Sequence, residues 1–208
     1  MKQLLNNRSA FTLIEIIIAM TIFGIIMVSV LSIFLFSSQM STRVEMNRLM
    51  QENIKNVTED ISENLRLSSL ADVIADGSNA SCAVTAFTGT GTKLCLKSWV
   101  EYTIGYFDES LNKWTKQNNI SECRDITKSN CHIIKADGSS ITDDYYPLSN
   151  SFTHFENMSF EITNQEIPKV SIHMTVRPSA KKWLAVEIVE NGITHIQTTL
   201  SERLITTN

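Results

Sequence analysis

Hydrophobic side chains are concentrated in one run near the N-terminus, whereas the rest of the chain is mixed in polarity. The run extends over residues 11–36, and Glu15 is its only charged residue. At roughly 1.5 Å per residue, a helix of this length measures about 39 Å, which exceeds the ~30 Å hydrocarbon core of a bilayer. The run therefore predicts a helix that is long and apolar enough to cross a membrane.

Residues 37–70 show a different pattern, with apolar side chains mostly three or four positions apart in a polar stretch. That spacing is typical of a helix with one apolar face. No Gly or Pro lies between Gly24 and Gly77, so we expect one continuous helix from Phe11 to about Ser69. Its second half should pack on a globular head through Val44, Met50, Ile54, Val57, Ile61 and Leu65.

Residues 71–208 alternate between apolar and polar positions in short segments separated by turn-forming sequences, which indicates strands. In residues 169–177, for example, Val170, Ile172, Met174 and Val176 share one side. We expect an antiparallel sheet with one face on the long helix, and thus an α+β fold. The predicted strands are residues 82–87, 93–98, 99–107, 113–117, 132–136, 158–163, 169–177, 183–190 and 193–204.

The residues before the apolar run carry Lys2 and Arg8 and no acid, which favours a cytoplasmic N-terminus and an exported head. An ordinary secretory signal has 7 to 15 apolar residues followed by a cleavage site after small residues. Here the order is reversed, because Ser9 and Ala10 precede the run. Cleavage after Ala10 would remove residues 1–10 as a basic leader and leave the apolar helix on the mature protein.

The sequence from Ala10 to Glu15, "AFTLIE", resembles the class III signal of type IV prepilins and type II secretion pseudopilins. That signal has a basic leader, a small residue before the cut, and then Phe-Thr-Leu, a hydrophobic residue and Glu. The resemblance implies that a prepilin peptidase cleaves between Ala10 and Phe11 and methylates the new amine of Phe11. The family usually has Gly before the cut, so Ala10 implies slower processing.

The order of segments in the head also resembles J-type minor pseudopilins and PilW-type minor pilins, with a hairpin at residues 102–114, a segment at 157–178 and a closing strand at 193–203. The resemblance implies a minor subunit that is anchored in the bacterial inner membrane and then placed at or near the tip of a pilus or pseudopilus. There it would prime assembly with other minor and major pilins. Within this class a DNA-uptake pseudopilin is the alternative. An uncleaved, signal-anchored surface receptor or adhesin is the alternative from another class.

Glu15 is energetically unfavourable in a bilayer, where a charged side chain costs on the order of 2.5–3.5 kcal/mol of insertion free energy. Cleavage would create a partner, the ammonium group of Phe11, which lies about 6 Å of helical rise before Glu15. By resemblance, the carboxylate pairs with the N-terminal amine of a neighbouring subunit in the filament. The partner can lie in the same chain or in the next one, and the residues leave this open.

Four cysteines follow the apolar run, and their spacing contains no CxxC pair. An even number beyond a membrane segment indicates disulfides in an oxidising compartment. Three pairings are possible, and we favour Cys82–Cys95 and Cys123–Cys131 because nearest-neighbour loops cost the least entropy to close. Four reduced and buried thiols are the alternative.

The head carries no recognisable catalytic chemistry. Its four histidines lack metal-binding spacing, and no nucleophile elbow or P-loop occurs, so we expect neither an enzyme nor a cofactor. A net charge of −4 gives no basic patch for direct nucleic-acid binding. A calcium site formed by Asp143 and Asp144, with Asp137 nearby, is a weaker hypothesis. Packing in the sheet is the expected role of Trp99, Trp114 and Trp183.

Overall fold

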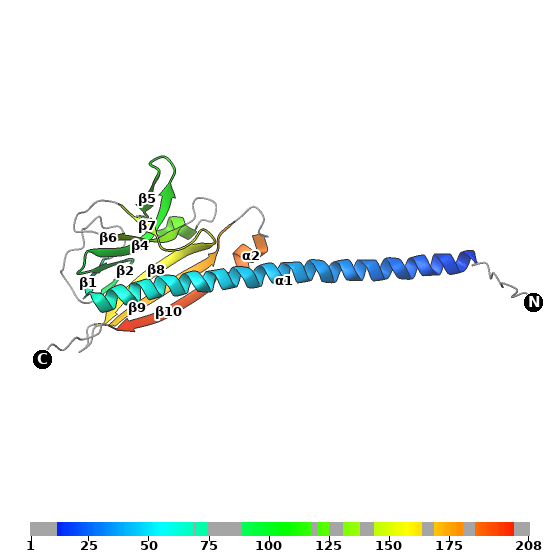
Figure 1. The fold of residues 1–208 in the computed structure, drawn as a ribbon, viewed down its shortest axis with the longest axis horizontal. Coiled ribbons are helices and arrows are strands. Elements are labelled where there is room, and N and C mark those ends of the chain that lie inside the picture. The colour runs from blue at the N-terminus through cyan, green and yellow to red at the C-terminus, as the bar shows by residue number, and fades with distance from the viewer. Residues whose placement is uncertain are drawn as a thin grey trace, which may run out of the picture. The chain divides into compact units, whose positions relative to one another are not determined.

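The computed structural model describes residues 12–68, 70–74, 89–117, 120–124, 131–137, 144–163, 169–180 and 186–201. The chain divides into two compact units, residues 1–44 and 45–208. The boundary lies inside the first helix, α1 (Leu13–Leu67), so the two units share one helix (Figure 1).

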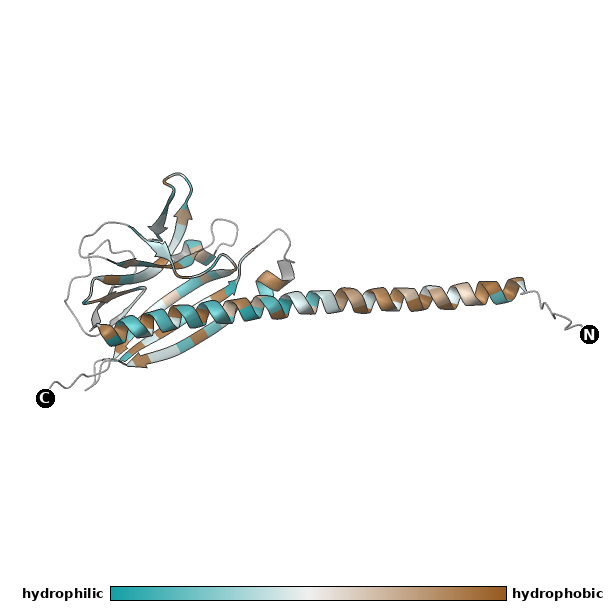
Figure 2. Cartoon of the chain, viewed as in Figure 1, coloured by the Kyte–Doolittle hydropathy of each residue, from teal (hydrophilic) through white to brown (hydrophobic). Residues whose placement is uncertain are grey.

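The first unit consists of the start of α1. The helix has 55 residues, and its bounds agree with the predicted helix to within two residues at each end. Every side chain from residue 12 to residue 41 is exposed, and Figure 2 shows that most of this stretch is hydrophobic. Among the described residues, α1 is the helix that is long and apolar enough to cross a membrane. None of its apolar segment is buried in the chain, which distinguishes it from the core helix of a soluble domain.

The second half of α1 packs on the head through one face, as the periodicity predicted. Four members of the expected apolar stripe are buried, namely Met50, Val57, Ile61 and Leu65, and Ile54 packs against the core at its margin. The prediction that Val44 packs on the head is wrong, because this residue is 63% exposed. The buried face also includes Met46 and the polar Asn53, neither of which the predicted stripe contained.

Two antiparallel sheets form the head and confirm the α+β class. One sheet has the order β1-β3-β4-β6-β7, with β5 also paired to β4, and the other has the order β10-β9-β8-β2. The elements are β1 (Leu70–Ile74), β2 (Gly89–Gly91), β3 (Lys93–Leu96), β4 (Val100–Asp108), β5 (Lys113–Lys116), the 3-10 helix η1 (Ile120–Arg124), β6 (His132–Asp137), β7 (Tyr146–Pro147), β8 (Thr153–Thr163), β9 (Lys169–Pro178), α2 (Val186–Asn191) and β10 (Thr194–Ser201).

One core joins the two sheets and the second half of α1. The alternation in β9 is confirmed, because Val170, Ile172, Met174 and Val176 are all buried. They meet Ile61 of α1 and the fully buried side chains of the other sheet. The hairpin predicted at residues 102–114 is present as well, with Phe107 of β4 directly opposite Trp114 of β5.

The strand predicted at residues 183–190 is wrong, because residues 186–191 form the helix α2. Ile188 and Val189 are adjacent in the sequence, and both pack with Met46 of α1. A strand would point neighbouring side chains to opposite faces, whereas one helical turn lets both contact the same patch. Strands β1, β2 and β7 have no counterpart among the predicted strands.

The expected packing role is wrong for Trp99, which is 53% exposed. Its backbone N–H bonds to the carbonyl of Leu96 at 3.0 Å, which closes the turn between β3 and β4. Trp99 has a φ of 64°, a conformation that favours Gly. Trp114, in contrast, is half-buried and stacks edge-on against His132. Trp183 lies outside the described residues.

Candidate functional site

The start of α1 is built around Thr12 and Glu15. The backbone N–H of Thr12 and its hydroxyl each donate a hydrogen bond to Oε2 of Glu15, both at 2.9 Å. In return, the N–H of Glu15 reaches the Thr12 hydroxyl at 3.4 Å. Thr12 directly precedes the helix and Glu15 is its third residue, so the pair forms a capping box.

This arrangement satisfies groups that a helix end leaves without partners. The first N–H groups of a helix have no acceptor within it, and an unpaired polar group is costly in a lipid environment. A carboxylate at this position also interacts favourably with the positive end of the helix dipole. The Thr-x-x-Glu spacing was available in the sequence but was not recognised as a cap. Glu15 therefore has local partners in addition to the predicted ammonium.

The two processing residues, Ala10 and Phe11, lie outside the described residues. The predicted contact between Glu15 and the amine of Phe11 therefore stays a prediction. Thr12 is the first residue described, and it places the carboxylate of Glu15 next to the backbone that follows the predicted cleavage point.

Asn53 connects the second half of α1 to the head. Its amide Nδ2 donates to the Thr153 hydroxyl at 2.6 Å, and its Oδ1 accepts from the N–H of Asn150 at 3.1 Å. Asn53 and Thr153 are both buried. A buried amide whose nitrogen and oxygen are both hydrogen-bonded fixes the position of its helix, because a shift would leave polar groups unpaired.

Asp60 forms a second polar connection between α1 and the head. It accepts a hydrogen bond of 2.7 Å from the hydroxyl of Tyr102 and lies 3.4 Å from the ammonium of Lys135. Lys135 also pairs with Asp137 at 3.6 Å, and Asp137 accepts a hydrogen bond from Tyr146. Burial and the carboxylate of Asp60 raise the pKa of Tyr102, so its hydroxyl stays a donor.

A further cluster lies between β3, β4 and β5. Glu101 pairs with Lys93 at 3.1 Å and with Lys116 at 3.0 Å, and it accepts a hydrogen bond from the Tyr145 hydroxyl at 2.8 Å. Burial lowers the pKa of Lys93, although the neighbouring carboxylate of Glu101 opposes the shift. These three partners of Glu101 come from strands or from residues beside them, so the cluster joins neighbouring segments of the head.

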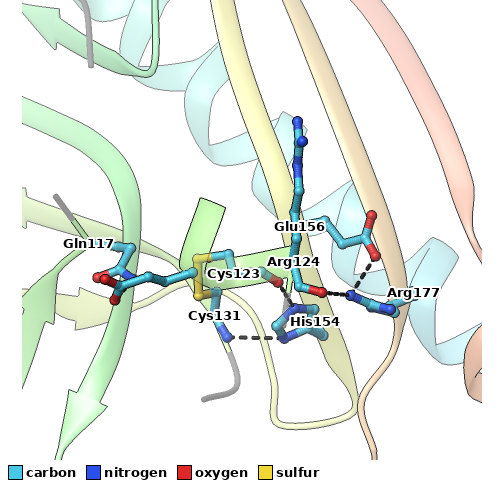
Figure 3. The surroundings of a disulfide bond; sticks show 8 residues. Gln117, Cys123, Arg124, Cys131, His154, Glu156 and Arg177 are labelled. Carbon is cyan, nitrogen blue, oxygen red and sulfur yellow. Dashed lines mark hydrogen bonds and ion pairs between the residues drawn. A yellow bond between two sulfur atoms is a disulfide. The ribbon is translucent and has the colours of Figure 1, made fainter. Parts of the chain in front are cut away.

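The Cys123–Cys131 disulfide is present as predicted, with an S–S distance of 2.01 Å. Figure 3 shows His154 of β8 beside it. The N–H of Cys131 donates to Nδ1 of His154 at 3.1 Å, and Nε2 of the ring donates to the carbonyl of Cys123 at 2.5 Å. Cys95 is also disulfide-bonded, but Cys82 lies outside the described residues, so its predicted pairing stays a prediction.

The hydrogen bonds of His154 fix its protonation. Nδ1 accepts a hydrogen bond, so it carries no proton, and the neutral ring carries its proton on Nε2. Burial lowers the pKa of His154, and the positive charge of Arg177 acts in the same direction. Arg177 pairs with Glu156 at 2.5 Å and donates to the carbonyl of Arg124 at 2.9 Å (Figure 3). Together, His154 and Arg177 hold η1 and the disulfide against β8 and β9.

The described residues contain no group of three metal-ligating side chains. Asp137, one of the three acids of the calcium hypothesis, is engaged with Lys135 and Tyr146, and Asp144 is exposed. Asp143 lies outside the described residues, so calcium binding stays a prediction. His132 and His154 are buried in the head, whereas His173 and His195 lie on the solvent-facing side of β9 and β10.

A comparison with protein families matches residues 5–31 to the prokaryotic N-terminal methylation motif. No curated protein and no solved structure matches the chain. The match covers the basic residue Arg8, the Ala10–Phe11 junction, the capping box and most of the apolar segment. The motif is found in structural proteins rather than enzymes, and it implies processing by a prepilin peptidase and assembly with other pilins. Residues 5–31 therefore form the class III signal of a type IV pilin-like precursor.

Proposed function

We propose that the chain is a minor pilin or pseudopilin, placed at or near the tip of a pilus or type II secretion pseudopilus to prime its assembly. The single observation that carries the proposal is the methylation motif over residues 5–31. The exposed apolar segment of α1 supports it, because that surface needs lipid or neighbouring helices to cover it.

In this proposal the peptidase cuts between Ala10 and Phe11 and methylates Phe11. The processed chain then stays in the inner membrane, with its head outside the cytoplasm, until assembly. The capping box holds the Glu15 carboxylate at the start of α1, where the amine of a neighbouring subunit can approach it. The energetic cost of leaving Glu15 without an opposite charge in lipid favours moving the chain into the growing filament.

Substitution of Glu15 by Gln tests the charge separately from the cap. Gln also serves at the third position of a capping box, so Glu15→Gln keeps the helix start but removes the negative charge. We expect normal amounts of the variant in the membrane and several-fold less in sheared filaments, measured by quantitative immunoblotting. Equal incorporation of Glu15→Gln and the unmodified chain would contradict the proposed role of the charge.

A further inference from the structure

Strand β10 forms the outer edge of its sheet. It pairs with β9 along its whole length, from Thr194 opposite Val176 to Ser201 opposite Lys169, without a bulge. No described strand pairs with its other edge, and Figure 1 shows β10 as the outermost strand of the sheet. Because the N–H and C=O groups of a strand point alternately to both sides, every second residue of β10 directs its backbone groups away from β9.

The sequence of β10 lacks the features that normally protect an edge from other strands. Residues 194–201 contain no Pro, Lys, Arg, Asp or Glu. The other edge strands are protected: β2 has three residues, β7 has two, and the pairing of β1 is irregular between Leu70 and Asp72. Strand β5, which pairs only with β4 among the named strands, has four residues and carries a lysine at each end. β10 has eight residues in regular register, so it is the long open edge of the described head.

The two faces of β10 define what an added strand would need. Ile196 and Leu200 face inward and pack against the core. On the outer face, His195 bonds to Thr175 at 3.1 Å and the Thr199 hydroxyl bonds to Ser171 at 3.1 Å. An added strand would match both faces of β10 if it placed apolar side chains beside Ile196 and Leu200 and neutral polar side chains on the outer face.

We propose that β10 accepts an extended strand from a neighbouring subunit during assembly, an inference that rests on the proposed function. The donated strand runs antiparallel to β10, as all pairs in this sheet do. It is uncharged, and its side chains alternate between apolar and polar. Main-chain hydrogen bonds supply the contact, and the alternation selects the donor.

The donor is a different chain rather than the β10 of a second copy. Residues 45–67 of α1 and β10 run in the same direction (Figure 1). Antiparallel pairing of two β10 strands would turn the α1 helices of the two copies in opposite directions. Subunits inserted into one membrane have the same orientation, so they cannot pair in this way. Antiparallel addition to β10 therefore needs a different strand, and in this proposal another pilin-like subunit presents it.

Two matched substitutions test the open edge. Gln197 on the outer face of β10 and Gln51 on α1 are both exposed, and each is replaced by Lys. A lysine on an edge strand opposes addition of another strand, because its charge would lose water. We expect Gln197→Lys to reduce incorporation into sheared filaments several-fold, with an unchanged melting temperature and membrane level. Gln51→Lys, with the same change of charge, should incorporate normally, and normal incorporation of Gln197→Lys would overturn the proposal.

Amide hydrogen exchange gives a second readout that side-chain docking would not reproduce. The processed full chain in detergent micelles is compared with the chain in sheared filaments, residue by residue over 194–201. We expect every second amide to gain protection only in filaments, because only these face the open edge. Unchanged exchange at all of them would overturn strand addition. If Glu15→Gln is impaired in the same assay while Gln197→Lys is normal, only this inference fails. Absence of the unmodified chain from filaments would overturn the proposed function as well.

Discussion

Thr12 donates two hydrogen bonds to one oxygen of the Glu15 carboxylate, one from its backbone N–H and one from its hydroxyl. The only acid of the apolar segment therefore has partners within its own first helical turn. Glu15 completes the helix start and also carries the charge that the proposed assembly step uses. These two roles are separable, because Thr12 affects the cap without changing the charge.

Substitution of Thr12 by Val should loosen the start of α1. The variant keeps the side-chain shape and the backbone N–H but loses the hydroxyl, which costs about 1 kcal/mol at a cap position. The amides of the first turn should exchange roughly five-fold faster in detergent micelles, which corresponds to that free energy. Thr12→Ser restores a hydroxyl and should return the exchange to its original rate. Equal exchange in all three chains would show that the hydroxyl does not stabilise the helix start.

Removal of the Asn53 amide should destabilise the head. Asn53→Ala leaves the buried Thr153 hydroxyl and the N–H of Asn150 without their partner, at a cost of about 1–3 kcal/mol in the free energy of unfolding. Asn56→Ala is the matched control, because Asn56 is exposed on the same helix. Chemical unfolding followed by tryptophan fluorescence measures both. If the two variants unfold alike, Asn53 does not hold α1 to the head.

The stability of the head should fall as the pH drops below about 6.5, the ordinary pKa of histidine. Burial lowers the pKa of His154 in the folded state, so the unfolded chain takes up the proton first. The contribution of His154 is complete above its unfolded pKa and decreases as the pH falls toward its folded pKa. Unfolding free energies at pH 7.5 and pH 5.5 measure the effect.

His154→Gln should flatten this dependence on pH, since Gln does not titrate in this range. His195→Gln is the control, because His195 is exposed on β10 and lies outside the disulfide region. The control should keep the full pH dependence of the unmodified chain. The prediction would be contradicted if the unfolding free energy still depended on pH in His154→Gln but no longer did so in His195→Gln.

The long helix and the main strands could be predicted because local sequence determines them. No Gly or Pro interrupts the helix from Gly24 to its end, and the alternation in β9 coincides with one buried face. Helix α2 could not be predicted in the same way. Its sequence fits a strand in isolation, and only Met46, about 140 positions earlier in the chain, makes a helical turn the better packing solution.

The polar part of the site was harder to predict, for a similar reason. Asn53 and His154 lie in the interior because their partners, Thr153 and the backbone of the two cysteines, are brought to them by the fold. Neither residue has a sequence pattern that marks it as buried. The capping box is different, because the Thr-x-x-Glu spacing is local and could have been recognised.

Mass spectrometry of the mature N-terminus tests the central claim most directly. The chain is expressed in a bacterium with its prepilin peptidase, purified from the membrane and analysed as the N-terminal peptide. The account predicts a peptide that begins with N-methylated Phe11, and faster conversion of the precursor in Ala10→Gly. A chain that keeps Met1 in both proteins, in cells that process their other prepilins, would contradict the account and favour an uncleaved membrane anchor.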